Sequence, residues 1–168
     1  MKILKQLLKQ PLATVPTKPV IILVIVALLG FADATYLTVE HFQGVIPPCS
    51  VVSGCETVLT SSYSVVAGIP VSLGGSIYYF LILIGLLVYI DTKKTYILKW
   101  TLWATMLGLL SSLWFLYVQA FILHAYCLYC LGSAVTSTLL FVIACWLIKK
   151  YTYVSDIQYL PDTNTLAQ

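Results

Sequence analysis

Residues 126–148 read YCLYCLGSAVTSTLLFVIACWLI, in which two cysteines three positions apart, Cys127 and Cys130, open a long apolar run. The run is long enough to cross a membrane as a helix, which takes about 20 apolar residues. Cysteines at positions i and i+3 are neighbours on a helix and can form a disulfide in its first turn. A helix N-terminus also favours the thiolate, which is the reactive form of cysteine. The stretch therefore predicts a spanning helix that begins with a redox-active dithiol.

The composition of the whole chain is that of an integral membrane protein. Of its 168 residues, 60% are hydrophobic and only 9% are charged, and the mean hydropathy is +0.96. Soluble domains lie far from these values. The apolar runs predict an all-α membrane protein, a four-transmembrane-helix bundle in a single domain (1–168), with spans at residues 20–39, 71–90, 100–123 and 126–148.

The basic residues predict how the bundle is oriented, because lysines in short loops stay on the cytoplasmic side. All nine lie before the first span, between the second and third, or after the fourth: Lys2, Lys5, Lys9, Lys18, Lys93, Lys94, Lys99, Lys149 and Lys150. A basic arm (1–19) is then cytoplasmic. The tail (149–168), which is expected to be disordered, is cytoplasmic as well. The loop at 40–70 and the turn at 124–126 face outward from a plasma or inner membrane. The net charge of +3 is an orientation signal and gives no reason to expect nucleic-acid binding.

Asp33 is the only charged residue inside the four spans. Ala32-Asp33-Ala34 ends an apolar run as a cleavable signal would, but helical character continues as far as Val39, which favours an uncleaved span. A carboxylate is costly in lipid, so Asp33 is expected to face the bundle interior or to lie near its outer boundary. Two interpretations stay open: a buried hydrogen bond to a neighbouring helix, or a direct role in proton transfer.

The outer loop at 40–70 is the longest polar connection in the chain, and loops of this length are usually functional. It contains Cys49, preceded by two prolines that favour an extended backbone, and Cys55. Val58 and Leu59, with Val65 and Val66, predict a short amphipathic helix that caps the bundle rather than crossing it. In the second span, Tyr78 begins a run of three aromatic residues. Such residues anchor a helix at the membrane interface or form the wall of a pocket for a flat ligand.

The cysteines divide by position along the spans. Cys49, Cys55, Cys127 and Cys130 all fall at the outer face and can form two pairs with three possible connectivities. Cys145 lies roughly 22 Å further down the last helix and is expected to be a small packing residue. Static disulfide braces are one interpretation of the four. However, a bridge that closes a two-residue gap constrains the unfolded chain very little, which favours a redox role for Cys127 and Cys130.

Other chemistries fit the sequence poorly. Zinc or iron–sulfur ligation is disfavoured by the oxidising outer face and the unequal cysteine spacings, so no metal site is predicted. Leu131 stands where covalent haem attachment would need a histidine, and no phosphate-binding loop, dinucleotide motif or nucleophilic serine motif is present. Thiol–disulfide exchange with a lipid-soluble two-electron acceptor, namely a quinone, is the function that the sequence favours.

Four motifs occur together in this chain: a loop cysteine pair, Cys-x-x-Val-Leu-x-Ser at residues 55–61, the aromatic Tyr63, and Cys-x-x-Cys opening the fourth span. Together they resemble the motifs of the vitamin K epoxide reductase family, in particular its prokaryotic disulfide-forming members. The resemblance implies that Cys49 exchanges with a thioredoxin-fold (DsbA-like) protein and that Cys55 passes electrons to Cys127. Cys130 would then reduce a quinone of the ubiquinone, menaquinone or vitamin K type. It also implies that Ser61 hydrogen-bonds the quinone with Tyr63 nearby, and we add Tyr78 as a third candidate contact.

Two departures from the family pattern refine this prediction. Vertebrate members carry an asparagine on the second span and a tyrosine one turn beyond the last active cysteine, where this chain has Val71 and Ala134. The difference favours quinone over epoxide as substrate. Many prokaryotic members carry a fused thioredoxin-like domain, whereas here we expect a separate partner protein.

Two alternative functions remain to be compared with this one. A bacterial quinone oxidoreductase of the disulfide-bond-formation protein B type has its two cysteine pairs in the opposite order, which argues against it. The other alternative is a non-enzymatic membrane scaffold of the tetraspanin or claudin type, stapled by disulfides.

Overall fold

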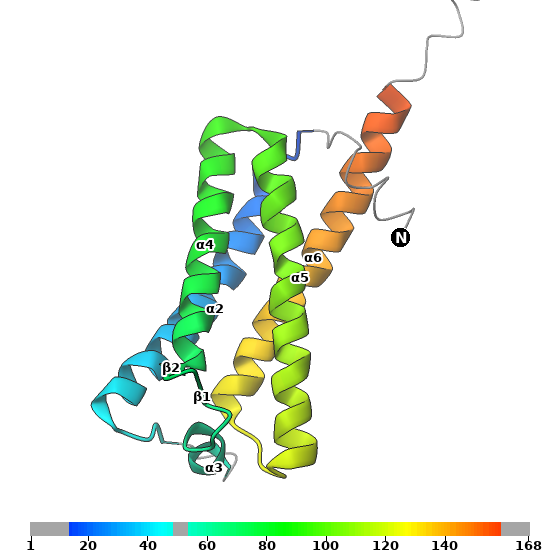
Figure 1. Ribbon diagram of the computed structural model, residues 1–168. Helices are drawn as coiled ribbons and strands as arrows, with labels where there is room; N and C mark the ends of the chain where they lie inside the picture. Colours follow the sequence, from blue (N-terminus) through cyan, green and yellow to red (C-terminus); the bar gives the residue numbers. More distant parts are fainter. Residues whose placement is uncertain (1–13, 49–53, 159–168) are drawn as a thin grey trace, which may run out of the picture.

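The computed structural model describes residues 14–48 and 54–158 of the chain (Figure 1). Within these residues, four helices are long and apolar enough to cross a membrane. They are α2 (Thr17–Gln43), α4 (Val71–Thr92), α5 (Thr95–Tyr117) and α6 (Leu128–Gln158). Segments in lipid become helical because a helix satisfies its backbone N–H and C=O groups internally where no water can do so. The predicted all-α bundle of four spanning helices is confirmed.

The backbone conformation of a single residue explains where most of the helices described here begin or end. α2 begins after the extended Pro16 and ends where Gly44 adopts a left-handed conformation, with φ of 68°. α4 follows Pro70 and ends before Lys93, which is also left-handed. Between α5 and α6 the chain forms a π-helical turn, Val118–Ile122, and a short link.

The fourth helix is longer than predicted. The polar composition after residue 148 predicts a disordered tail, but α6 continues to Gln158. The physical reason is that residues 149–158 contain neither glycine nor proline, and the first helix-breaking residue after them is Pro161. Residues 159–168, and residues 1–13 of the predicted basic arm, lie outside the described part of the chain.

Small residues allow the helices to pack closely. Gly30 of α2 lies against the ring of Tyr79 on α4, so close that a Cβ atom on Gly30 would overlap the ring. The Tyr79 hydroxyl donates to the carbonyl oxygen of Ser133, at 3.0 Å, and lies 2.8 Å from Thr136 Oγ1, both on α6. Tyr79 therefore ties three helices together. Most of the core is apolar, and its largest fully buried side chains include Leu23, Leu86, Leu98, Leu140 and Leu147.

The end of the bundle that carries the described lysines is fastened by polar contacts. The buried Tyr89 hydroxyl on α4 accepts a hydrogen bond from the Val15 N–H and donates one to the Val15 carbonyl, both at 2.8 Å. Lys93 Nζ donates to Thr17 Oγ1, also at 2.8 Å. These bonds join the start of α2 to the end of α4.

A small cap covers the opposite end of the bundle (Figure 1). It consists of the short helix α3 (Cys55–Leu59) and a hairpin of β1 (Val65–Val66) and β2 (Ile69–Pro70). The predicted capping helix is present, but the expectation that Val65 and Val66 belong to it is wrong. Ala67 and Gly68 both have positive φ, 52° and 80°, and two such residues form the tight turn that joins antiparallel strands.

Candidate functional site

The helix-end cysteines occupy two different environments at the capped end. Cys127 immediately precedes α6 and is completely buried, whereas Cys130, in the first turn, is partly exposed. The Cys127 N–H donates to Gln119 Oε1 at 2.9 Å, and the Ala125 N–H donates to the Gln119 carbonyl at 3.1 Å. Gln119 is itself buried in the π-helical turn. Gln119 therefore holds the link between α5 and α6 through two hydrogen bonds.

The surroundings of Cys127 favour its thiolate. A hydrogen bond with the Cys130 side chain is the main cause that lowers its pKa to about 7, and the backbone N–H groups of Tyr129 and Cys130 act in the same direction. Burial and the negative charge of Asp33 oppose the shift. These N–H groups are free because the first turn of a helix has no preceding carbonyls to receive them. Cys127 is therefore the member of the pair that ionises near neutral pH.

This ionisation predicts a measurable titration. A depressed pKa means that the thiolate is present above the pKa and absent below it, so the ultraviolet thiolate absorbance of the fully reduced protein should rise with a midpoint near pH 7. Cys127→Ser should remove this step, and Cys145→Ser should keep it. A first thiolate step only near pH 8.5, the ordinary cysteine value, would contradict the assignment.

Cys55 lies next to the helix-end pair. It is the first residue of α3, is buried, and forms a small apolar cluster with Val58 and Cys127, against which Cys130 also packs. Cys55 is disulfide-bonded, whereas Cys127, Cys130 and Cys145 are thiols. The predicted loop cysteine Cys49 lies outside the described residues. Three of the four predicted redox cysteines are therefore side by side.

Two contacts hold the loop around its cysteines to the link before α6. Gly54, just before Cys55, lies so close to the backbone of Tyr126 that a Cβ atom would come within 2.7 Å of its N and O atoms. On the other flank, the Tyr129 hydroxyl donates to the Pro48 carbonyl at 3.3 Å. The Tyr129 ring also packs on Tyr36 of α2, with 5.5 Å between ring centroids. Both flanks of the loop thus contact the segment that carries Cys127.

Gly54→Ala should separate Cys55 from Cys127. The added methyl group meets backbone atoms, which cannot rotate away, so the loop must shift. A displacement of about 1 Å at reacting atoms slows a reaction by ~10²-fold, and we expect that loss in the exchange between loop and helix-end pair, followed by rapid mixing with a reduced thioredoxin-fold protein.

Gly132→Ala on α6 is the matched control for this change. Its added Cβ atom would meet nothing within 4 Å, so exchange should proceed at the wild-type rate. An unchanged rate in Gly54→Ala would show that this contact does not position Cys55.

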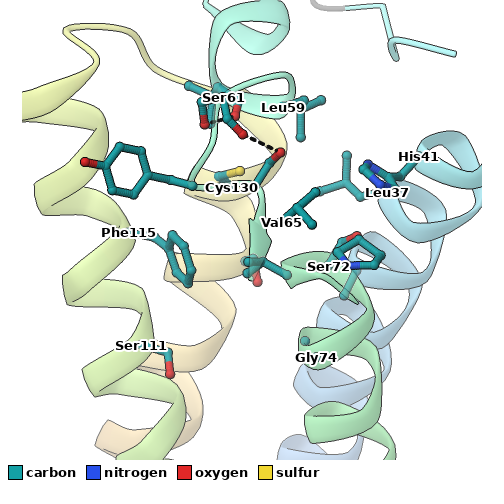
Figure 2. A pocket seen from close by; sticks show the side chains of 18 of the residues that line it. Leu37, His41, Leu59, Ser61, Val65, Ser72, Gly74, Ser111, Phe115 and Cys130 are labelled. Carbon is teal, nitrogen blue, oxygen red and sulfur yellow. Dashed lines mark hydrogen bonds between the residues drawn. The ribbon is translucent and has the colours of Figure 1, made fainter. Parts of the chain in front are cut away.

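A cavity of about 1040 Å³ opens inside the capped end of the bundle. All four spanning helices, the segment after α3 and the hairpin contribute to its wall, and Figure 2 shows Cys130 beneath Ser61, with Phe115 of α5 nearby. The predicted quinone contacts Ser61, Tyr63 and Tyr78 also line it. Cys127 does not line the cavity. One member of the pair therefore borders this space while the other lies against Cys55.

Two residues of the cavity wall, Asp33 and Tyr78, each carry a buried polar atom without a partner in the part of the chain that the structure describes. Among the described residues, the buried atoms Asp33 Oδ2 and Tyr78 Oη make no hydrogen bond, which is costly unless a ligand supplies the partner. Ser61 behaves differently, because its hydroxyl donates to the Val58 carbonyl at 2.8 Å. To donate to a ligand, it would have to give up that bond.

Sequence reasoning missed Gln119. The sequence did contain a signal for it. An amide side chain inside an apolar span is unusual and needs a hydrogen-bond partner, and Gln119 stands eight residues before Cys127. His124, in the short link, is exposed with φ of 49° and is not among the groups that shift the Cys127 pKa.

The fold and site define a class of protein, the four-span membrane protein with a dithiol at the buried end of one helix beside an internal cavity. The model of the vitamin K epoxide reductase family matches residues 21–145. The chain belongs to this family, as its motifs predict. Membership implies a membrane thiol–disulfide oxidoreductase, in a family that uses quinone-type compounds and generally pairs with thioredoxin-like partners. None of the curated proteins compared with the chain matches it.

Proposed function

We propose that this protein transfers electrons from a thioredoxin-fold partner to a quinone and so supports disulfide formation outside the cytoplasm. Cys49 exchanges with the partner, Cys55 passes the electrons to Cys127, and Cys130 delivers them to the quinone. The observation that carries the proposal is the placement of the helix-end pair. Cys127 is buried against Cys55, and Cys130 borders the cavity.

This placement suits an electron relay across the membrane surface. A soluble partner cannot enter lipid, so the loop cysteines meet it at the aqueous end. Each exchange is an attack by a thiolate on a disulfide, and the low pKa of Cys127 makes its thiolate available near neutral pH. Cys55 in a disulfide beside two free thiols corresponds to the state in which the helix-end pair holds two electrons.

The cavity is the proposed quinone site. When bound, the quinone supplies a two-electron acceptor that stays within the membrane. Tyr78, Asp33, Ser61 and Tyr63 all line the cavity. Ubiquinone, menaquinone and vitamin K all carry the ring and two carbonyl groups that such a site would recognise.

The proposed orientation places the cysteines on the extracytoplasmic side. The described lysines lie at the start of α2, at the α4–α5 connection with the start of α5, and late in α6, away from the capped end (Figure 1). By the positive-inside rule, both termini, including the arm (1–19) and the residues after 148, are then cytoplasmic. The chain acts in this proposal as one multi-pass domain.

Reconstitution in lipid tests the function directly. Purified protein is mixed with a reduced thioredoxin-fold protein and a short-tailed ubiquinone or menaquinone, and quinone reduction is followed by its absorbance. We expect one quinol for each partner disulfide formed, since both are two-electron couples. Absence of quinone reduction with either quinone would overturn the proposal and favour the disulfide-stapled scaffold.

A further inference from the structure

Asp33 is a carboxylic acid in the cavity that the cysteine relay leaves without a role. It lies in the middle of α2, lines the cavity together with Cys130, and is half-buried. Its charge reaches the helix-end pair, because it raises the pKa of Cys127. An acidic residue at this depth is costly and is usually functional.

The purely structural explanation of Asp33 does not hold for its buried oxygen. The expected hydrogen bond to a neighbouring helix is absent at Oδ2, which has no partner among the described residues. Nearby polar residues on α2 are satisfied within the protein: Thr38 bonds the Ala34 carbonyl at 2.7 Å and lies 3.3 Å from Ser76 Oγ. Asp33 Oδ2 therefore differs from these neighbours as a buried polar atom without a partner among the described residues, on a residue that lines the cavity.

The proposed reaction needs proton transfer at this place. When the Cys127–Cys130 dithiol closes to a disulfide, it releases two electrons and two protons. Reduction of a quinone to a quinol consumes two electrons and two protons. The quinone must receive its protons in a cavity that is mostly apolar, where a charged oxygen without a proton donor is strongly disfavoured.

We propose that Asp33 is a catalytic acid and base that carries one of these protons from the helix-end dithiol to a quinone oxygen. The inference rests on the proposed function and extends it. The neutral carboxyl group of Asp33 donates its proton to one quinone oxygen, and its carboxylate then takes the thiol proton of Cys130, which lines the cavity with it. Cys127 releases the second proton, and the second quinone oxygen takes one up. The sum is dithiol plus quinone to disulfide plus quinol, with Asp33 unchanged.

The first test compares Asp33→Asn with wild type, using dithiothreitol as the reductant and a short-tailed ubiquinone. Asparagine has nearly the same shape but carries no exchangeable acid proton. General acid–base groups contribute about 10²–10⁴-fold, so kcat should fall by at least ~10²-fold with KM nearly unchanged. Asp33→Glu should recover most of the rate. The carboxylate-to-amide control is Asp91→Asn, at the exposed end of α4, which should behave as wild type.

The second test does not depend on turnover. Infrared difference spectra of oxidised wild-type protein, recorded as ubiquinone is added, should show a carboxyl band that shifts and that Asp33→Asn lacks. Wild-type kcat in Asp33→Asn, or no band that changes with ubiquinone, would overturn this role. If wild type reduces no quinone, the proposed function itself fails. Should Asp33→Asn not fold, Asp33→Glu assigns the band: it should move the band to a different frequency, and an unmoved band would overturn this role.

Discussion

Cys130→Ala is expected to abolish quinone reduction, with a rate at least ~10³-fold below wild type, as loss of a reacting nucleophile produces in other enzymes. Cys130 is the only described cysteine that lines the cavity. Its removal leaves the pair without the sulfur that borders the cavity, so the helix-end disulfide cannot close and two electrons cannot pass to the quinone. The measurement is steady-state quinone reduction in lipid, with the reduced thioredoxin-fold protein as donor.

Cys145→Ala is the matched control for this loss. Cys145 is on the same helix, is a free and exposed thiol, and does not line the cavity, so its replacement should leave the rate at the wild-type value. A Cys130→Ala protein that retains its activity would exclude quinone reduction by this pair. Equal losses in both variants would point to a general effect of losing a cysteine from α6.

Cys49→Ala should discriminate between reductants. If Cys49 is the residue that exchanges with the protein partner, turnover with a reduced thioredoxin-fold protein should fall at least ~10²-fold, because the reacting sulfur is gone. Dithiothreitol is small enough to reach the helix-end pair without the loop, so turnover with it should persist. Both rates are measured on the same reconstituted sample.

The small dithiol is the internal control for Cys49→Ala. Preserved activity with dithiothreitol shows that the quinone site and the Cys127–Cys130 pair are intact. If both reductants lose activity equally, Cys49 has no special docking role. If neither loses activity, the partner enters the relay at another cysteine.

Much of the fold was predictable because lipid imposes one solution on long apolar segments. Four such runs correspond to the four spanning helices, and prolines before the first two explain where α2 and α4 begin. The hairpin at Val65–Val66 was not predictable from its two-residue strands, which carry too short an alternation to be distinguished from a helical turn. The extension of α6 to Gln158 was missed because a short polar segment without apolar periodicity carries little signal for a helix.

The candidate site was predictable in its location and less so in its geometry. Cysteine spacing and the lysine pattern predict that four cysteines share one end, and among the described residues the structure brings Cys55 next to Cys127 and Cys130. The sequence did not reveal which member of the pair would face the cavity, since this depends on how the first turn of α6 packs against α3. The two interpretations of Asp33 could not be compared from the sequence, because they depend on its surroundings in three dimensions.

The link between α5 and α6 has a practical consequence for engineering. Surface loops usually accept an inserted domain, but only where few backbone groups are engaged. Here the N–H groups of Leu123, Ala125 and Cys127 are all bonded back to the π-helical turn. A fusion partner inserted in this link to aid imaging would break the hydrogen bond between the Cys127 N–H and Gln119. The insertion should therefore inactivate the enzyme even while its four helices remain folded.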